Sequence, residues 1–106
     1  MRLLSLALTC ATVFSANAYA QDYVLTLKDH TFSPQELALP ANEKVTIIVK
    51  NNDASPAEFE SDKLGREKVI AANSEGKVLV GPLKAGSYEF VDDFHRDTAK
   101  GTITVQ

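Results

Sequence analysis

Apolar and polar residues alternate along the chain in short runs of strand length. In the strongest run, Lys44-Val-Thr-Ile-Ile-Val-Lys50, the side chains of Val45, Ile47 and Val49 fall on one face. Turn residues separate it from other extended runs, at 22–28, 35–39, 57–60, 69–70, 77–81, 88–90 and 102–105. The polar segment 61–68 is long enough for a single helical turn. The pattern predicts an all-β sandwich of about eight antiparallel strands.

The inward positions of these runs predict the hydrophobic core, which comprises Val45, Ile47, Val49, Phe59, Val78, Val80, Tyr88, Phe90 and Ile103. The last two runs bracket a loop that holds Asp92, Asp93, His95 and Asp97. Strands on both sides would fix where these side chains point, and carboxylates and imidazoles are common metal ligands. The loop is therefore the first candidate for a functional site.

The first twenty residues have a different pattern. Arg2 precedes an apolar run from Leu3 to Phe14, and the run closes on the small-x-small sequence Ala18-Tyr19-Ala20. This is typical of a signal peptide, residues 1–20, whose removal leaves one domain of residues 21–106 in the periplasm. The run is too short for a membrane span, so the protein is not expected to span the membrane. The alternative is a lipoprotein signal at Ala7-Leu-Thr-Cys10, which would make Cys10 the acylated first residue.

Composition excludes several classes of function. Cys10 is the only cysteine of the 106 residues, so a chain without residues 1–20 has neither a disulfide nor a thiolate ligand. The formal net charge is −3, and no basic patch favours nucleic acid as a partner. No Ser-His-Asp arrangement or Gly-rich phosphate loop is present. The mild acidity is compatible with binding cations.

Several segments, in their order and spacing, resemble the cupredoxins, which are small periplasmic Greek-key β-sandwiches that hold copper at one end. The segments are Phe32-Ser-Pro34, Asn51-Asn52, Pro56-Ala-Glu-Phe59, Leu83-Lys-Ala-Gly-Ser-Tyr-Glu-Phe90 and Gly101-Thr-Ile-Thr-Val105. In a blue-copper member, the resemblance would place a His after the Pro, and a Cys, a second His and a Met in the last loop. Here those positions hold Ala57, Asp92, His95 and Thr98 or Ala99. An ordinary blue-copper electron carrier is excluded, because its site requires the sulfur of the Cys.

Three further segments resemble the cupredoxin-like proteins that accompany bacterial high-affinity iron permeases. They are Glu58-Phe-Glu60, Arg66-Glu-Lys68 and Asp92-Asp-Phe-His95. The resemblance implies ferrous iron uptake, in which the protein handles Fe(II) or oxidises it as a copper-dependent oxidant. It also implies a bound copper or iron ion, and as partners a periplasmic iron-uptake protein and an inner-membrane iron permease. Hard carboxylate oxygens suit ferric iron, and an imidazole accommodates copper or Fe(II).

Each candidate metal ligand also has a plainer interpretation. Asp92 and His95 have the spacing of the parent Cys and His ligands, but an isolated pair of this kind is more often a capping Asp and a solvated His. Asp93 would face away from Asp92 in an extended loop, where it is either a surface charge or a support for His95. His30, in an early loop, is expected at the surface, away from the site.

The glutamates carry the same ambiguity. Glu58 and Glu60 flank Phe59 on a strand, so both face solvent if Phe59 enters the core. Glu67 lies between Arg66 and Lys68, where an ion pair is the ordinary explanation. The alternative function is a metal-free module that docks a permease or another periplasmic protein. Homodimerisation is left open, because four protein ligands are hard to find in one loop.

Overall fold

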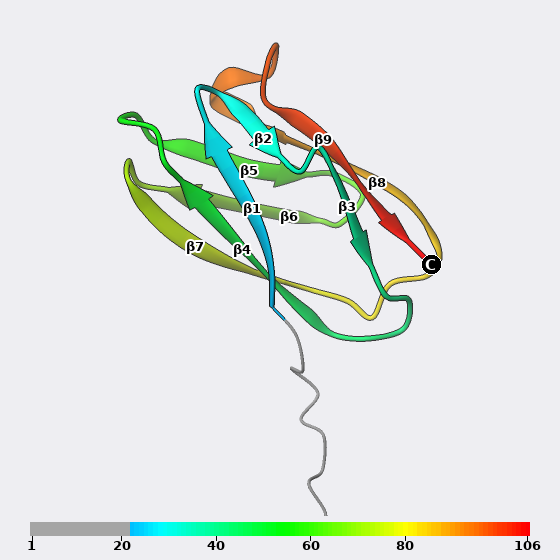
Figure 1. Ribbon diagram of the computed structural model, residues 1–106. Helices are drawn as coiled ribbons and strands as arrows, with labels where there is room; N and C mark the ends of the chain where they lie inside the picture. Colours follow the sequence, from blue (N-terminus) through cyan, green and yellow to red (C-terminus); the bar gives the residue numbers. More distant parts are fainter. Residues whose placement is uncertain (1–21) are drawn as a thin grey trace, which may run out of the picture.

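The computed structural model describes residues 22–106, which form nine strands and one short 3-10 helix (Figure 1). The predicted signal peptide and the alternative at Cys10 lie outside the described residues. The elements are β1 (Asp22–Lys28), β2 (Thr31–Ser33), β3 (Glu36–Leu39), β4 (Val45–Asn51), β5 (Ala57–Ser61), β6 (Arg66–Ile70), β7 (Ser74–Val80), β8 (Gly86–Asp92), η1 (Asp93–His95) and β9 (Lys100–Val105). The predicted all-β class is confirmed.

The strands form two sheets that pack face to face, in the orders β2-β1-β4-β7 and β3-β9-β8-β5-β6. The prediction of a wholly antiparallel sandwich was wrong, because β1 pairs with β4 and β3 pairs with β9 in parallel. Between β1 and β4 the chain crosses to β3 of the other sheet, and between β3 and β9 it crosses to β4 and again to β7 of the other sheet. Such a crossover can bring the chain back in the direction in which it left, whereas a two-residue hairpin cannot.

The segment 61–68, for which the sequence allowed a single helical turn, contains none. Residues 62–65 form a turn in which the Gly65 amide donates to the Asp62 carbonyl at 3.0 Å. Gly65 has φ +63°, a conformation that other residues adopt at a cost. The chain thereby reverses into β6, which pairs with β5 and places Glu67 directly opposite Glu60.

The predicted core lies between the two sheets. Eight of the nine predicted residues are buried, and Tyr88 is half-buried against them, with its hydroxyl donating to the Lys84 carbonyl at 2.7 Å. Phe90 meets Phe32 edge to face at 5.0 Å and stacks on Phe59 at 5.5 Å between ring centroids. These rings join both sheets beneath the end of the sandwich that carries the candidate site.

A buried polar network joins the loops at that end. The side-chain amide of Asn51, which is fully buried, donates to the carbonyls of Ser55, Ile70 and Ala71, and its oxygen accepts the Asp53 amide. The Asp53 carboxylate in turn accepts the amides of Asp29 and His30 at 2.6 and 2.9 Å. Asn51 and Asp53 therefore fix the turn between β1 and β2 against the loop that follows β4.

Candidate metal centre

Asp92 and Asp93 are adjacent in sequence but point in different directions. The side chain of Asp92 is fully buried, whereas that of Asp93 is about one-third exposed. Asp92 ends β8 with extended backbone and caps η1, which begins at Asp93. The predicted opposition of the two carboxylates assumed an extended loop, whereas the extended backbone ends at Asp92 and Asp93 opens η1.

The Asp92 carboxylate is occupied by contacts within the protein. Its Oδ1 accepts the amides of Glu58 and Phe94 at 2.9 and 3.0 Å, and its Oδ2 lies 2.8 Å from Nδ1 of His95. Nδ1 is therefore the nitrogen of the His95 ring that faces Asp92, and the contact orients the ring. The structure thus brings Asp92 and His95 together as bonded partners, with Asp92 behind the ring.

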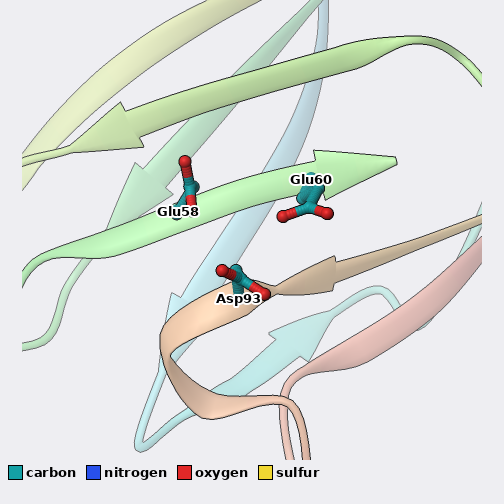
Figure 2. A group of neighbouring side chains, drawn as sticks. All are labelled: Glu58, Glu60 and Asp93. Carbon is teal, nitrogen blue, oxygen red and sulfur yellow. The ribbon is translucent and has the colours of Figure 1, made fainter. Parts of the chain in front are cut away.

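A separate acidic group lies on the outer face of the second sheet. Ligand oxygens of Glu58, Glu60 and Asp93 lie within 4.8 Å of one another (Figure 2). Phe59 between the two glutamates is buried, which turns both glutamates outward, as the alternation along β5 predicted. Figure 2 shows Asp93 at the end of β8, beside the two glutamates. We call these three residues the carboxylate group.

Mutual repulsion characterises the carboxylate group. Burial and then a hydrogen bond with Asp93 raise the pKa of Glu58, and the charges of Glu67, Asp93 and Glu60 raise it further. Glu67 is exposed and, as the cross-strand partner of Glu60, adds a negative charge beside the group without joining it. A cation at this position would relieve the repulsion between like charges.

Arg96 already provides one positive charge to the carboxylate group. Its Nε donates to Oδ1 of Asp93, and a terminal guanidinium nitrogen donates to Oε1 of Glu60 at 3.3 Å. The hydrogen bond with Asp93 is the main reason that the pKa of Arg96 is raised. Its side chain is 56% exposed, so these ion pairs are solvated and weak. A metal ion that binds here competes with Arg96.

His95 is not part of the carboxylate group and lies instead against His30. The two imidazole rings stack with centroids 3.7 Å apart and planes inclined by 18°. The expectation that His30 lies away from the site was wrong. The turn that contains His30 is held by the carboxylate of Asp53. Asp53 itself lies in a distant run of turn residues, and the local sequence pattern does not show which segment such a residue contacts. By accepting the amides of Asp29 and His30, the buried Asp53 carboxylate keeps His30 at this end of the sandwich.

Comparison with known proteins identifies the family. A family model for the cupredoxin-like domain matches residues 1–105. The chain belongs to this family. It is 42% identical over 81 residues to an uncharacterized protein of Rickettsia prowazekii, an alignment that covers 76% of this chain and 65% of the relative.

Solved structures support the same fold. The metal-binding domain of the Cu(I)-exporting P-type ATPase CopA of Streptococcus pneumoniae superposes with a TM-score of 0.73 at 20% identity, over 85% of this chain and 88% of that one. Auracyanin A, a blue copper protein of Chloroflexus aurantiacus, gives 0.69 at 16% identity over 81% and 98% of the two chains. Amicyanin of Paracoccus versutus gives 0.64 at 19% identity over 86% and 87%. At these identities the likeness establishes the fold alone.

This cupredoxin-like domain does not carry the donor set of a blue-copper site. The first His position is held by the buried Ala57, and the Met position by Thr98 or the buried Ala99. None of these three side chains offers an imidazole or a sulfur. Asp92, at the Cys position, is engaged by two amides and His95. Among residues 22–106, the oxygens of the carboxylate group are the ligand atoms that lie close together. Within residues 22–106, no helix has the length and apolar character needed to cross a membrane.

Proposed function

We propose that this cupredoxin-like protein binds a metal ion in the periplasm and serves ferrous iron uptake. The observation that carries the proposal is the carboxylate group, in which Glu58, Glu60 and Asp93 offer ligand oxygens within 4.8 Å of one another. The raised pKa of Glu58, which follows from burial, the hydrogen bond with Asp93 and neighbouring negative charges, supports it. An iron ion would bind these oxygens and remove the repulsion.

The chemistry of the group suits iron that must be passed on. Carboxylate oxygens are hard donors, which favour iron over softer cations such as Cu(I). The three side chains are only partly buried, so a bound ion remains accessible to a partner. The proposed partners are an inner-membrane iron permease and a periplasmic iron-uptake protein, as the resemblance of residues 58–60, 66–68 and 92–95 implies. Oxidation of Fe(II) additionally requires a one-electron acceptor, for which Cu(II) is the candidate.

The second candidate is a metal-free module that docks such a permease or another periplasmic protein. One observation favours it: Arg96 pairs with Asp93 and Glu60, so the carboxylate group is partly neutralised without a metal. In that case the group and Arg96 would form a charged surface for a protein partner.

Titration with Fe(II) under anaerobic conditions separates the two candidates. The full chain with Cys10→Ser, which removes the only thiol, should bind Fe(II) with micromolar or tighter affinity, equivalent to about −8 kcal/mol. The double variant Glu58→Gln/Glu60→Gln should bind at least about tenfold more weakly. Glu75→Gln, an exposed glutamate on β7 of the other sheet, is the matched control. If the parent does not bind Fe(II), or if the double variant binds it equally well, the iron-binding function is rejected and the metal-free docking module is the function that is kept.

The role in uptake is tested in cells. A strain that lacks the protein should take up radiolabelled Fe(II) more slowly, and the Glu75→Gln control should restore the rate. The Glu58→Gln/Glu60→Gln variant should fail to restore it although it is exported in equal amount. A normal rate of Fe(II) uptake in the strain that lacks the protein would contradict the role in iron uptake. It would not contradict metal binding by the carboxylate group, which the titration tests.

A further inference from the structure

We propose that a cleft at the open edge of the sandwich binds an acidic side chain from an extended segment of a partner protein. It lies where β4 and β6 begin and β7 ends, and it is lined by Lys44, Arg66 and Leu79 beside the buried Val45 and Val80. We call it the edge cleft. It goes beyond the proposed function, because it does not include the carboxylate group and does not require a bound metal.

Arg66 reaches across the edge cleft from one sheet to the other. β6 is an edge strand of the second sheet, and β7 is an edge strand of the first. Arg66 pairs with the buried Ser61 and so points toward the space between the sheets, whereas the next residue, Glu67, points outward. The Nε of Arg66 donates to the Leu79 carbonyl at 2.8 Å, and its Nη1 donates to the Gly65 carbonyl at 3.1 Å. These bonds hold the guanidinium in place before a ligand arrives.

The two cations of the edge cleft lack an anionic partner within residues 22–106. The ion pairs there are those of His30, His95 and Arg96, and none of them includes Arg66 or Lys44. A guanidinium has more N–H groups than the two bonds to carbonyls use, so in this part of the chain both terminal nitrogens of Arg66 keep an unused donor. Two such donors can bind one carboxylate through parallel hydrogen bonds. The edge cleft therefore favours a carboxylate as its ligand.

Size and apolar surface narrow the ligand to one side chain of a peptide. The volume of the edge cleft is about 210 Å³, below the range of roughly 300 to 1,000 Å³ in which small molecules and cofactors bind. Leu79 is 57% exposed beside it and offers a contact to an apolar neighbour of the acidic residue. Extended segments of partner proteins commonly bind along sheet edges. The expected ligand is therefore an Asp or Glu next to an apolar residue.

Protection of the sheet edge would explain Arg66 but not Lys44. Charged side chains on edge strands commonly hinder pairing with another chain. Lys44, however, directly precedes β4, which lies between β1 and β7 and is paired on both sides. Its positive charge contributes to the edge cleft without protecting an edge. From the cleft, β4 runs for seven residues, roughly 20 Å, toward the loops that hold His30, so a segment bound in the cleft leaves that end uncovered.

NMR titration of the full chain with Cys10→Ser, without metal, tests the edge cleft. The probe is the peptide Gly-Leu-Glu-Leu-Gly, acetylated and amidated at its ends, and a matched peptide carries Gln in place of Glu. The first should shift the Nε–H signal of Arg66 and the methyl signals of Leu79 in a saturable manner, and the second should bind at least about tenfold more weakly. Lys44→Gln and Arg66→Gln, followed at Leu79, should each weaken binding at least about fivefold. Lys77→Gln, which removes the same charge from the exposed outer face of β7, should change it less than about twofold.

Arg66→Lys, which keeps the charge but not the planar pair of donors, should bind more weakly than the parent and more tightly than Arg66→Gln. Circular dichroism and thermal unfolding establish that the variants fold. The proposal is overturned if neither peptide binds or both bind equally, or if folded Lys44→Gln and Arg66→Gln bind as tightly as the parent. It is also overturned if the Gln peptide binds only when its C-terminal carboxylate is free and the Glu peptide does not bind, since the ligand would then be a chain end. Because no metal is present, none of these outcomes decides the Fe(II) titration of the carboxylate group.

Discussion

The imidazole ring of His30 lies flat on the ring of His95, with 3.7 Å between their centroids and 18° between their planes. Asp53 stands behind the first ring and Asp92 behind the second. The cupredoxin-like fold thus places two imidazoles with buried carboxylates at one end and three carboxylates on the outer face of the second sheet. Oxygen and nitrogen donors, which the sequence assigned to one site, are divided between two places.

Cu(II) bound to the chain with Cys10→Ser should give only weak absorption in the visible range. The intense band of blue copper arises from a copper–thiolate bond, and residues 21–106 contain no cysteine. Ultraviolet–visible titration measures this directly. An intense band near the blue-copper position would contradict the assignment of Asp92 to the Cys position.

Arg96→Gln should strengthen Fe(II) binding by the carboxylate group about two- to fivefold, because the metal ion no longer has to displace a weak, solvated ion pair. The guanidinium contacts Asp93 and Glu60, both of which a metal ion would have to recruit. The effect should shrink as salt rises. Lys77→Gln, the same charge change at an exposed position on the other sheet, should leave affinity nearly unchanged. Equal gains in both variants would indicate a general effect of net charge.

Asp92→Ala should lower the free energy of unfolding by about 2 to 5 kcal/mol, whether or not metal is present. The change leaves the amides of Glu58 and Phe94 without their acceptor and removes the partner of His95. Asp92→Asn, which keeps one acceptor oxygen, should cost less. Chemical denaturation measures both variants. A change below about 0.5 kcal/mol in Asp92→Ala would show that these bonds are replaced by water.

Asp53 should make the fold sensitive to acid. Burial raises the pKa of its carboxyl, but the amides of His30 and Asp29 and the charges of His30 and Lys28 outweigh burial and lower it. A carboxyl with a lowered pKa in the folded state stabilises the fold above its unfolded value, about 3.9, and this contribution is lost as pH falls through the folded pKa. Unfolding curves of the parent and Asp53→Asn should therefore converge below about pH 4. A constant difference down to pH 2 would contradict this linkage.

Ile47→Ala should destabilise the fold by about 2 to 5 kcal/mol, since the side chain is fully buried between the sheets and its loss leaves a cavity. Val69→Ala is the control, because Val69 is 57% exposed. Its effect should stay within about 0.5 kcal/mol. Denaturant unfolding with both variants measures the contrast, and similar losses would mean that the strand register is misassigned.

The sequence by itself determined on which face of a strand each side chain lies, because that depends only on neighbouring residues. The alternation of residues 44–50 predicted the core face of β4, and the burial of Phe59 with outward Glu58 and Glu60 followed from the two-residue period of a strand. These relations are local, because successive side chains of extended backbone face opposite sides whatever the rest of the chain does.

Only the tertiary structure decided which loops meet. The stacking of His30 on His95 requires that the turn after β1 and the helical turn after β8 reach the same end of two different sheets. Strand order and the parallel pairing of β1 with β4 set that arrangement, and Asp53 then fixes the turn through two backbone amides. Alternation assigns a residue to a face but carries no information about the distant segment that packs against it. The separation of the carboxylate group from the stacked rings of His30 and His95 therefore emerged only from the three-dimensional fold.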